Sequence, residues 1–457
     1  MNPQATLAGT RLNDIVGSQN VICDAQKLSA YAVDGVIPKA AARPGTAQEI
    51  SELVKFAAAE NLAIIPTGAR SKLGIGMPPE RYDLAIDMTR LDRVSSYDPG
   101  DLTLSVEPGI PLERLAAILA EHNQFLPLDV PFFERATVGG TLASGVDSPL
   151  RHAYGTARDF VLGMEFVTGD GALAKSGGRV VKNVTGYDLH KLMLGAIGSL
   201  GVITRVNFKT FPLPSSTATF VGAFASSDAA AKFNLAVHKS PLRCQAVEIL
   251  SPAAVASMST NRVSTVFGRD SSNPFFAALS VAGNAAVIAR SERDLHSLAQ
   301  SAAGSHCEFT RIEDLQEKQL WTAIREFSTT LQARPEAAII KVSCLPSDFS
   351  AFFDESIIAA KKHSTEIAHV FHGCGVCYCL VFSPQNSPSD LAACCKELLD
   401  RSASAARNAS IPWCGPELKR DLSIWGVPRE DFPLMQRVKQ AFDPHNIFAP
   451  GRFVGGL

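Results

Sequence analysis

The chain has 457 residues, roughly two or three times the length of a typical domain, so more than one hydrophobic core is expected. Hydrophobic residues at 46% and charged residues at 19%, with no low-complexity tract, exclude a disordered or fibrous protein. The formal net charge of -2 provides no overall field that would steer the chain onto nucleic acid or an acidic membrane surface.

The N-terminal segment "MNPQATLAGTRLNDIVG" lacks the apolar core of a signal peptide. No apolar run in the chain approaches the roughly 20 residues that a membrane span requires. These features predict a cytoplasmic protein without a membrane span, whose only contact with a membrane would be made through partner proteins.

The first predicted elements alternate between helix and strand. Thr46, followed three residues later by Glu49, is a helix-start signal, and apolar residues continue at helical spacing to Phe56. The runs "LAIIPTG" and "DLAIDMT" then read as strands, and "VSSYD" and "LTLSVEPG" read as a hairpin around "PGD". Residues 111–123 are predicted to form a helix with Pro111 at its first position.

Further along, "FVLGMEFVTGDGALAKSGG" is a predicted hairpin with Asp170 and Gly171 at its turn. The segment "GYDLHKLMLGAIGSLGVITRVNFKTFPLP" predicts a helix, a Gly-Ser-Leu-Gly break and a strand that ends at prolines. Because no regular βαβ repeat is present, these residues predict an α+β domain rather than a doubly wound sheet. From about residue 215, strands and helices alternate at the scale of a split-βαβ cap domain.

Ten cysteines are scattered through the chain and are read as reduced thiols. The sequence "CGVC" at 374–377 could supply half of a zinc or iron–sulfur site, but only "CCKE" lies near enough to provide a second ligand pair. The run "VCYCLVF" alternates like a strand in which Cys is a small hydrophobic residue. The strand is the favoured interpretation, and no metal site is predicted.

Three segments rich in glycine lie between residues 64 and 204: "IIPTGARSKLGIG", "ATVGGTLASG" and "GAIGSLGVIT". The first is not a phosphate loop of the Walker type, because Lys72 is followed by Leu73, and it is not a Rossmann fingerprint. Backbone amides around Gly68 could instead form a concave anion site, although a surface turn would use the same residue types. No catalytic triad, zincin or kinase motif accompanies the three segments, which together indicate a long cofactor.

Six motifs in this order resemble one known family: "PTGARSKLG", "SVEPGIPLERL", "ATVGGTLASG", "YGTARDFVLGMEFVTGDG", "KNVTGYDLHKLMLGAIGSLGVITRV" and "AFDPHNIFAPGRF". They resemble the flavin-binding domain of the vanillyl-alcohol oxidase / p-cresol methylhydroxylase (PCMH) superfamily. Within it, the chain looks most like the FAD-binding subunits of glycolate oxidases (glycolate dehydrogenases). The resemblance is dense over about residues 38–215 and thin in the C-terminal segment.

The resemblance implies an α+β fold in which a PCMH-type FAD-binding domain of two subdomains precedes a ferredoxin-like α+β cap and a C-terminal helical tail. The expected divisions are 1–37, 38–214, 215–410 and 411–457, the last returning to the FAD domain.

The same resemblance implies which residues contact FAD, although packing or turn formation would explain many of them equally well. The implied contacts are Pro66, Thr67, Gly68, Ala69, Arg70, Ser71, Lys72 and Leu73 at the pyrophosphate, Thr137, Gly139, Gly140, Ser144 and Gly145 at the ribityl chain and ring, then Gly155, Arg158, Asp159, Asn183 and Gly186, with Val202 and Ile203 at the isoalloxazine or adenine side.

Some members of the superfamily tether the flavin through a His in the first loop. In this chain the residue before Ser71 is Arg70, whose guanidinium cannot form that linkage but can bind a phosphate or offset charge near a flavin. Noncovalent FAD is therefore predicted.

Relatives that oxidise 2-hydroxy acids carry a cap motif close to H-x-G-D-G-N, whose histidines help to hold a metal ion. The nearest segment here, "AHVFHGCGVCY", contains His369 and His372 but no Asp-Gly-Asn, which argues against a metal site. His372 and Arg452 are the candidate catalytic residues, and the alternatives are a structural His and a surface Arg.

The resulting prediction is an FAD-dependent oxidoreductase in which a 2-hydroxy acid such as glycolate gives a hydride to flavin N5 and electrons pass to an acceptor. The resemblance implies a complex with a second flavin subunit and an iron–sulfur subunit. Two alternatives remain open, namely a stand-alone FAD dehydrogenase of another hydroxy acid or alcohol and a non-enzymatic binding or assembly subunit with a flavin fold.

Overall fold

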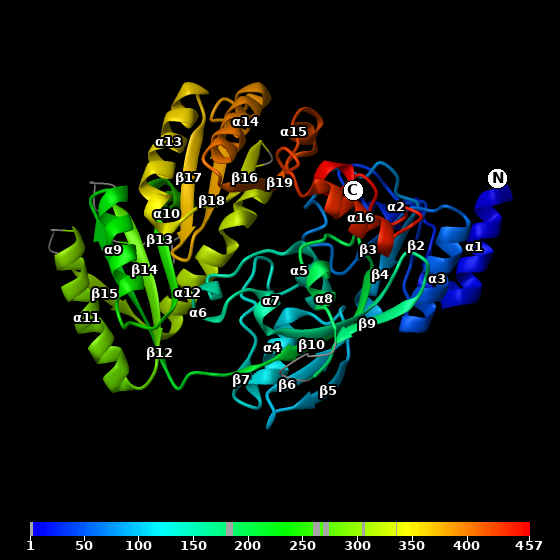
Figure 1. Ribbon diagram of the computed structural model, residues 1–457, viewed down its shortest axis with the longest axis horizontal. Coiled ribbons are helices and arrows are strands. Elements are labelled where there is room, and N and C mark those ends of the chain that lie inside the picture. The colour runs from blue at the N-terminus through cyan, green and yellow to red at the C-terminus, as the bar shows by residue number, and fades with distance from the viewer. Residues whose placement is uncertain (1–2, 180–185, 259–265, 268–273, 304–306, 335) are drawn as a thin grey trace.

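The computed structural model describes residues 3–179, 186–258, 266–267, 274–303, 307–334 and 336–457. Their elements form an α+β protein, as expected, and fall into three parts (Figure 1). We call residues 3–212 the base, residues 217–414 the cap and residues 415–457 the tail. The tail, red in Figure 1, folds back onto the base beside the blue N-terminal elements.

The first half of the base is a small sheet with the strand order β1-β2-β4-β3, in which β2, β4 and β3 are parallel. The Thr46 side chain accepts a hydrogen bond from the Glu49 backbone N–H at 3.1 Å and so begins the helix predicted there. The elements of this half are α1 (Pro3–Val16), η1 (Ser18–Asn20), β1 (Val21–Ile22), α2 (Ala25–Leu28), η2 (Ser29–Tyr31), β2 (Ala40–Ala42), α3 (Ala47–Ala59), β3 (Ile64–Thr67), β4 (Leu84–Asp87) and η3 (Met88–Arg90).

The second half of the base is an antiparallel sheet with the strand order β5-β6-β10-β8-β9, next to the short pair β11-β7. Both predicted hairpins are present, and Gly171 at the turn of the second has a φ of 80°. The elements are β5 (Val94–Asp98), β6 (Thr103–Val106), α4 (Leu112–Ala120), β7 (Gln124–Phe125), α5 (Val138–Ser144), α6 (Arg151–Tyr154), α7 (Ala157–Phe160), β8 (Val161–Val167), β9 (Leu173–Gly177), α8 (His190–Met193), β10 (Val202–Lys209) and β11 (Phe211–Pro212).

One prediction in this half needs a small correction. Pro111 precedes α4 as its N-cap residue with a φ of -64° and a ψ of 142°, whereas the sequence placed it at the first helical position. The extended ψ angle orients the chain into the helix without making Pro111 part of it.

The cap consists of one sheet whose strand order, within the described residues, is β15-β12-β14-β13-β17-β18-β16-β19, with every neighbouring pair antiparallel. Its elements are β12 (Thr217–Phe224), α9 (Ser227–Lys239), β13 (Cys244–Leu250), α10 (Pro252–Met258), β14 (Phe275–Ala282), α11 (Ala285–Ala303), β15 (Phe309–Ile312), α12 (Asp314–Arg325), η4 (Glu326–Ala333), β16 (Ala337–Ser343), η5 (Pro346–Asp348), α13 (Phe349–Lys362), β17 (Glu366–His372), β18 (Val376–Phe382), α14 (Pro388–Ser404) and β19 (Asn408–Cys414).

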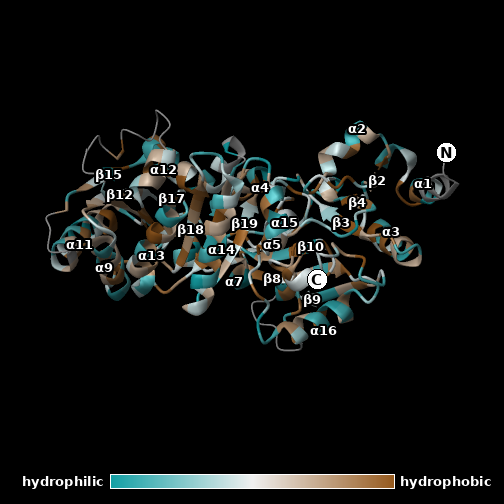
Figure 2. Ribbon diagram, turned by 90° about the horizontal axis from the view of Figure 1, so that it is seen from above, coloured by the Kyte–Doolittle hydropathy of each residue, from teal (hydrophilic) through white to brown (hydrophobic). Residues whose placement is uncertain are grey.

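The two faces of the cap sheet have different neighbours. One face packs against α9, α11, α13 and α14, and the other packs against α10, α12, η4 and loops of the base. In Figure 2 the strands β17 and β18 are brown, whereas the helices that flank them carry both colours, as expected for a sheet covered on both sides.

Strand alternation decides which side chains of the cap face the base. Successive side chains of a strand point to opposite faces. Cys377 and Cys379 therefore pack on the face covered by α9, α11, α13 and α14, which we call the helix face, while Tyr378 between them faces the base. This confirms the interpretation of "VCYCLVF" as a strand. All ten cysteines are free, and among the described residues no group of three or more His, Cys, Asp or Glu side chains is arranged to hold a metal ion.

The tail contains α15 (Pro416–Asp421), α16 (Phe432–Phe442) and η6 (Val454–Gly456). It extends the first sheet of the base, because the Ile64 backbone N–H donates to the Ile447 carbonyl at 2.7 Å and the Ala449 N–H donates to the Ile64 carbonyl at 2.8 Å. In the part of the chain that the structure describes, no helix is both long enough and apolar enough to cross a membrane.

Candidate active site

A cleft with about 870 Å³ of space between its walls lies where the three glycine-rich segments meet. It opens at the end of β3, and residues 66–73, which comprise the last two residues of this strand and the loop after it, are called the cofactor loop here. The carboxyl ends of parallel strands are a common place for ligand sites, because chain segments diverge there. The predicted cofactor residues that line this cleft are Pro66, Thr67, Gly68, Ala69, Arg70, Ser71, Lys72, Leu73, Thr137, Gly139, Gly140, Ser144, Val202 and Ile203.

The loop and the second glycine segment contact each other closely. A Cβ atom on Gly68 would lie 2.1 Å from the Thr137 hydroxyl oxygen, so only glycine allows this approach. Thr137 in turn is the N-cap of α5, and its hydroxyl accepts a hydrogen bond from the Gly140 N–H at 3.4 Å. Two of the three glycine segments are therefore fixed against each other at one end of the cleft.

Arg70 lies in the loop with a φ of 62° and makes two contacts within the base. Its guanidinium is 3.3 Å from the Asp87 carboxylate and lies over the Tyr31 ring, 4.6 Å from the ring centre. Burial and a 2.6 Å hydrogen bond to Asp87 raise the pKa of Tyr31 to about 12. The Arg70 charge is thus partly balanced before any ligand binds.

Arg452, a predicted catalytic residue, lines the same cleft. Its guanidinium donates hydrogen bonds to backbone carbonyls at the end of the cofactor loop and just after it. It donates to the carbonyls of Leu73 and Ile75 at 2.5 and 2.6 Å and to that of Met77 at 3.4 Å. Lys419, also in the tail, donates to the Gly74 carbonyl at 2.6 Å. Arg452 therefore positions the segment that follows the cofactor loop, and its catalytic role stays a prediction.

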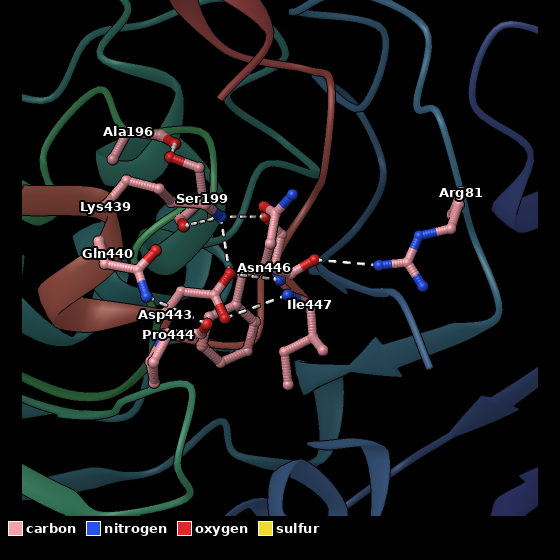
Figure 3. A network of polar contacts seen from close by, with 10 residues as sticks. Arg81, Ala196, Ser199, Lys439, Gln440, Asp443, Pro444, Asn446 and Ile447 are labelled. Carbon is pink, nitrogen blue, oxygen red and sulfur yellow. Dashed lines mark hydrogen bonds and ion pairs between the residues drawn. The ribbon is translucent and has the colours of Figure 1, made fainter. Parts of the chain in front are cut away.

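The third glycine segment is held by the tail through a buried network (Figure 3). The Lys439 ammonium donates to the Ser199 carbonyl at 2.9 Å, to the Asp443 carboxylate at 2.6 Å and to the Phe448 carbonyl at 2.8 Å. The Asp443 carboxylate also accepts hydrogen bonds from the backbone N–H groups of Ile447 and Phe448. Lys439 and Asp443 were not predicted as site residues, and their i,i+4 charge pairing in "KQAFD" is the only sequence signal that could have indicated them.

Several predicted cofactor residues do not line the cleft. Gly145 ends α5 with a φ of 62° and packs against Gly195. Asp159 forms a capping box with Thr156, in which the Asp159 carboxylate accepts from the Thr156 N–H at 2.7 Å, and Gly155 packs against the Asp159 side chain. The remaining residues are Arg158, which donates to the Lys191 carbonyl at 2.8 Å, Gly186, which is exposed, and Asn183, which is outside the described residues.

His372, the other predicted catalytic residue, lies on the face of the cap sheet that meets the base. Glu248 is its partner in the β13–β17 register, and both carboxylate oxygens are 2.7 Å from His372 Nδ1. Both side chains are buried, and burial raises the pKa of Glu248 although His372 opposes the shift. Glu248 was missed in the sequence, where the signal is one carboxylate within the apolar strand "CQAVEIL".

A smaller cavity of about 320 Å³ lies beside His372, between the cap and the base. Its polar lining residues are Asp129, Asp147, Arg325, Ser328, His372 and Tyr378. Burial alone would raise the pKa of Asp147, but Lys341 at 2.5 Å and Arg151 at 2.6 Å together lower it. Asp147 comes from the base and Lys341 from the cap, so this ion pair joins the two parts at the cavity.

A loop of residues 129–136 runs between the cleft and this cavity. The Glu326 carboxylate of the cap accepts from the Phe132 N–H at 3.0 Å, and Arg325 pairs with Asp129 at 2.9 Å. Pro131 of this loop lines the cavity, while the Phe132 ring lies near Lys72 of the cleft. This loop therefore lines the cavity through Asp129 and Pro131 and lies near the cleft through Phe132.

The walls of the cleft suit a ligand with a flat apolar ring and negative charge. Met88, Met193 and Leu200 contribute apolar surface to the cleft, and Gly198 and Gly201 also line it. The Lys72 ammonium has no hydrogen-bond partner among the described residues. An unpartnered buried cation indicates an anionic ligand.

Comparison with solved structures identifies the fold. The chain superposes on 4-ethylphenol oxidase from Gulosibacter chungangensis with a TM-score of 0.77, 16% identity and coverage of 99% of this chain and 97% of that chain. For p-cresol methylhydroxylase the TM-score is 0.76 at 17% identity, again covering 99% and 97%. The fold is therefore that of the PCMH-type FAD-binding proteins, which confirms the expected fold class.

Family models agree with this class. The model described as FAD binding domain matches residues 38–177, and the model described as FAD linked oxidases, C-terminal domain, matches residues 213–409 and 419–453, more than half of the chain. The chain belongs to the FAD-linked oxidase family. FAD is its cofactor and its activity is that of an FAD-linked oxidoreductase, as the sequence predicted.

Curated relatives include dehydrogenases of hydroxy acids. The D-2-hydroxyglutarate dehydrogenase of Xanthomonas citri pv. viticola is 26% identical over 424 residues, which cover 91% of this chain and 89% of that protein. The mitochondrial D-lactate dehydrogenase [cytochrome] of Arabidopsis thaliana is 26% identical over 92% of this chain and 74% of its own. Glycolate oxidase subunit GlcE of Escherichia coli is 37% identical over 171 residues, 37% of this chain and 48% of that protein.

Proposed function

We propose that this chain is an FAD-dependent dehydrogenase of a 2-hydroxy acid, with glycolate, D-lactate and D-2-hydroxyglutarate as the candidate donors. The observation that carries the proposal is that His372, hydrogen-bonded to the buried Glu248, lines a polar cavity beside the loop of residues 129–136, whose Phe132 lies near Lys72 of the cofactor cleft. FAD, when bound, accepts a hydride from the donor and passes the electrons to an acceptor. The protein contributes placement, exclusion of water and proton transfer.

The cofactor residues act by placement. Residues 66–71 of the cofactor loop would hold the pyrophosphate, because Arg70 adds a cation to a backbone that bends back at a positive φ. Gly139, Gly140, Val202 and Ile203 line the cleft, and the absence of a side chain at Gly139 allows α5 to pack closely against Pro108. No His occupies the loop, so we propose that FAD is bound noncovalently.

His372 would accept the hydroxyl proton of the donor. Because the Glu248 carboxylate is hydrogen-bonded to Nδ1, the proton of the neutral ring is held there and Nε2 remains as the acceptor. The same carboxylate stabilises the imidazolium that forms after proton transfer. Glu248 is thus a positioning residue for His372, as the carboxylate is in other carboxylate–histidine pairs.

The test begins with the visible spectrum of the purified chain, followed by reduction of an artificial dye with each of the three hydroxy acids. We expect the visible absorption band of oxidised flavin, and we expect at least one of the three donors to reduce the dye. A flavin band without reduction by any 2-hydroxy acid would contradict the proposed substrate class. Failure to take up FAD at all would instead favour the non-enzymatic alternative.

The match to glycolate oxidase subunits GlcE and GlcD supports a second form of the proposal, in which this chain works with a second flavin subunit and an iron–sulfur subunit. Co-expression with its genomic neighbours and purification on a tag on this chain would test it. Activity that appears only in a co-purified complex would favour the subunit, and activity of the single chain would favour the stand-alone dehydrogenase. The cytoplasmic location and the domain divisions at 38, 215 and 411 also stay predictions.

A further inference from the structure

Lys72 differs from the other lysines that the described structure buries. Its side chain is 8% exposed and its Nζ has no hydrogen-bond partner there. Lys419 is also buried, but it contacts Asp34 at 2.8 Å and the Gly74 carbonyl. Lys439 likewise contacts Asp443 and two carbonyls. A buried ammonium without a partner is unfavourable, and an anionic ligand in the cleft would supply the missing acceptor.

The Lys72 side chain extends from the cofactor loop toward the loop of residues 129–136. Its Nζ is 5.7 Å from the centre of the Phe132 ring, and the Arg135 guanidinium is 4.8 Å from the same ring. The Phe132 N–H is bonded to Glu326 of the cap. Lys72 therefore lies on the side of the cleft that faces the cap, where the donor would meet the cofactor.

The charges around Lys72 favour an anion in this place. Burial lowers the pKa of Lys72 to about 8, with Glu326 opposing this shift and Arg135 adding to it. Glu326 does not form an ion pair with Lys72, because its carboxylate is used by the Phe132 N–H and by Arg325. Lys72 and Arg135 both lie near the Phe132 ring, and the Glu326 carboxylate is already bonded to other groups. The positive charge at this place is therefore free to attract an anionic group.

We propose that Lys72 binds the carboxylate of the 2-hydroxy acid donor, an inference that rests on the proposed function. A 2-hydroxy acid carries a carboxylate and a hydroxyl on adjacent carbons. Lys72 takes the carboxylate on the cleft side of the loop of residues 129–136. Lys72 would thereby select hydroxy acids over plain alcohols, which lack the anionic group.

The test uses the FAD-loaded full chain, with Lys72→Met as the variant and Lys239→Met, an exposed lysine of α9, as the control. Three measurements are made: the Kd of FAD, the Kd of oxalate by equilibrium dialysis, and steady-state kinetics that give KM and kcat for the donor. We expect the Kd of oxalate and the KM of the donor to rise roughly 10- to 100-fold in Lys72→Met, the range of a hydrogen bond to a charged group. The Kd of FAD should change less than about twofold.

A large rise in the Kd of FAD with unchanged oxalate binding would overturn the inference, because Lys72 would then serve a phosphate of the cofactor. Unchanged values in all three measurements would overturn it as well. The wild-type chain separates the two proposals: if it oxidises no 2-hydroxy acid, the proposed function fails, whereas wild-type turnover with an unaffected variant removes only the role of Lys72.

A second measurement keeps the test independent of the folding of Lys72→Met. Lys72 carries its charge below a pH of about 8 and loses it above that value. Oxalate stays a dianion over this range, so its Kd for the wild-type holoprotein should rise as the pH increases through about 8. Lys72→Arg keeps the charge and should give a flatter profile, since Arg is always protonated. A flat wild-type profile would contradict the inference.

Discussion

Lys439 in α16 donates a 2.9 Å hydrogen bond to the backbone carbonyl of Ser199, and this contact ties the tail to the wall of the cofactor cleft (Figure 3). The ammonium is buried and also bonds to Asp443 and to the Phe448 carbonyl. The carbonyl of Ser199 lies in the segment that supplies Gly198, Gly201 and Val202 to the cleft. The position of that wall therefore depends on a residue 240 positions later in the chain.

Lys439→Met should destabilise the protein by about 3–5 kcal/mol, because it leaves the Asp443 carboxylate buried without its cation. The segment around Ser199 would also lose its anchor, so FAD should dissociate more readily. Urea unfolding and FAD titration measure both effects. The control is Lys396→Met, which removes an exposed i,i+4 pair with Asp400 and should change stability by less than about 0.5 kcal/mol. Equal effects of the two variants would contradict this account.

Glu248→Gln should lower kcat for the donor by roughly 10²–10⁴-fold while FAD content stays that of the wild type. The amide keeps the shape of the carboxylate but cannot stabilise an imidazolium at His372. Glu397→Gln is the matched control, because Glu397 pairs with His363 Nε2 at 2.8 Å on the surface of the cap, away from both cavities. Steady-state dye reduction over a range of pH measures the difference. Full activity of Glu248→Gln would remove His372 from the mechanism.

Gly68→Ala should weaken FAD binding at least about tenfold, because the new Cβ would lie 2.1 Å from the Thr137 hydroxyl and force the loop away from α5. Gly74→Ala is the control in the same segment, since no atom lies within 4 Å of the position of its Cβ. Fluorescence titration of each apoprotein with FAD measures the change. Similar FAD affinities for both variants would show that the loop can shift without loss of the site.

Acid denaturation should release all flavin from the protein. The loop has Arg70 where tethered relatives have His, and a guanidinium cannot carry the covalent bond. After precipitation with acid, the supernatant should be yellow and the washed pellet colourless. Flavin fluorescence that stays with the pellet would contradict noncovalent binding.

Local features of the fold could be predicted from the sequence because short-range interactions determine them. The Thr46 cap, the turn at Gly171 and the strand that holds Cys377 each depend on a few neighbouring residues. The segment "TARD" contained a similar local signal, since Thr156 and Asp159 have the spacing of a capping box. The resemblance assigned Asp159 to the cofactor, whereas in the structure its carboxylate caps the first turn of α7 together with Thr156.

The long-range parts of the site could not be predicted in this way. Glu248 meets His372 only because β13 pairs with β17 in one register, and the two residues are 124 positions apart. A shift of one residue would turn Glu248 to the helix face. The burial of Arg452 depends in the same way on the return of the tail to the base, which one arginine in "PGR" does not indicate.

The return of the tail to the base also sets the order of events during synthesis. Ile64 pairs with residues 447 and 449, and Arg452 binds backbone carbonyls at the end of the cofactor loop and after it. Lys439 binds the Ser199 carbonyl in the third glycine-rich segment. While the ribosome is still translating residues 213–431, the cleft lacks these supports. Stable uptake of FAD therefore has to wait until the segment 432–452 has left the ribosome, and a nascent chain stalled before that point should stay free of flavin.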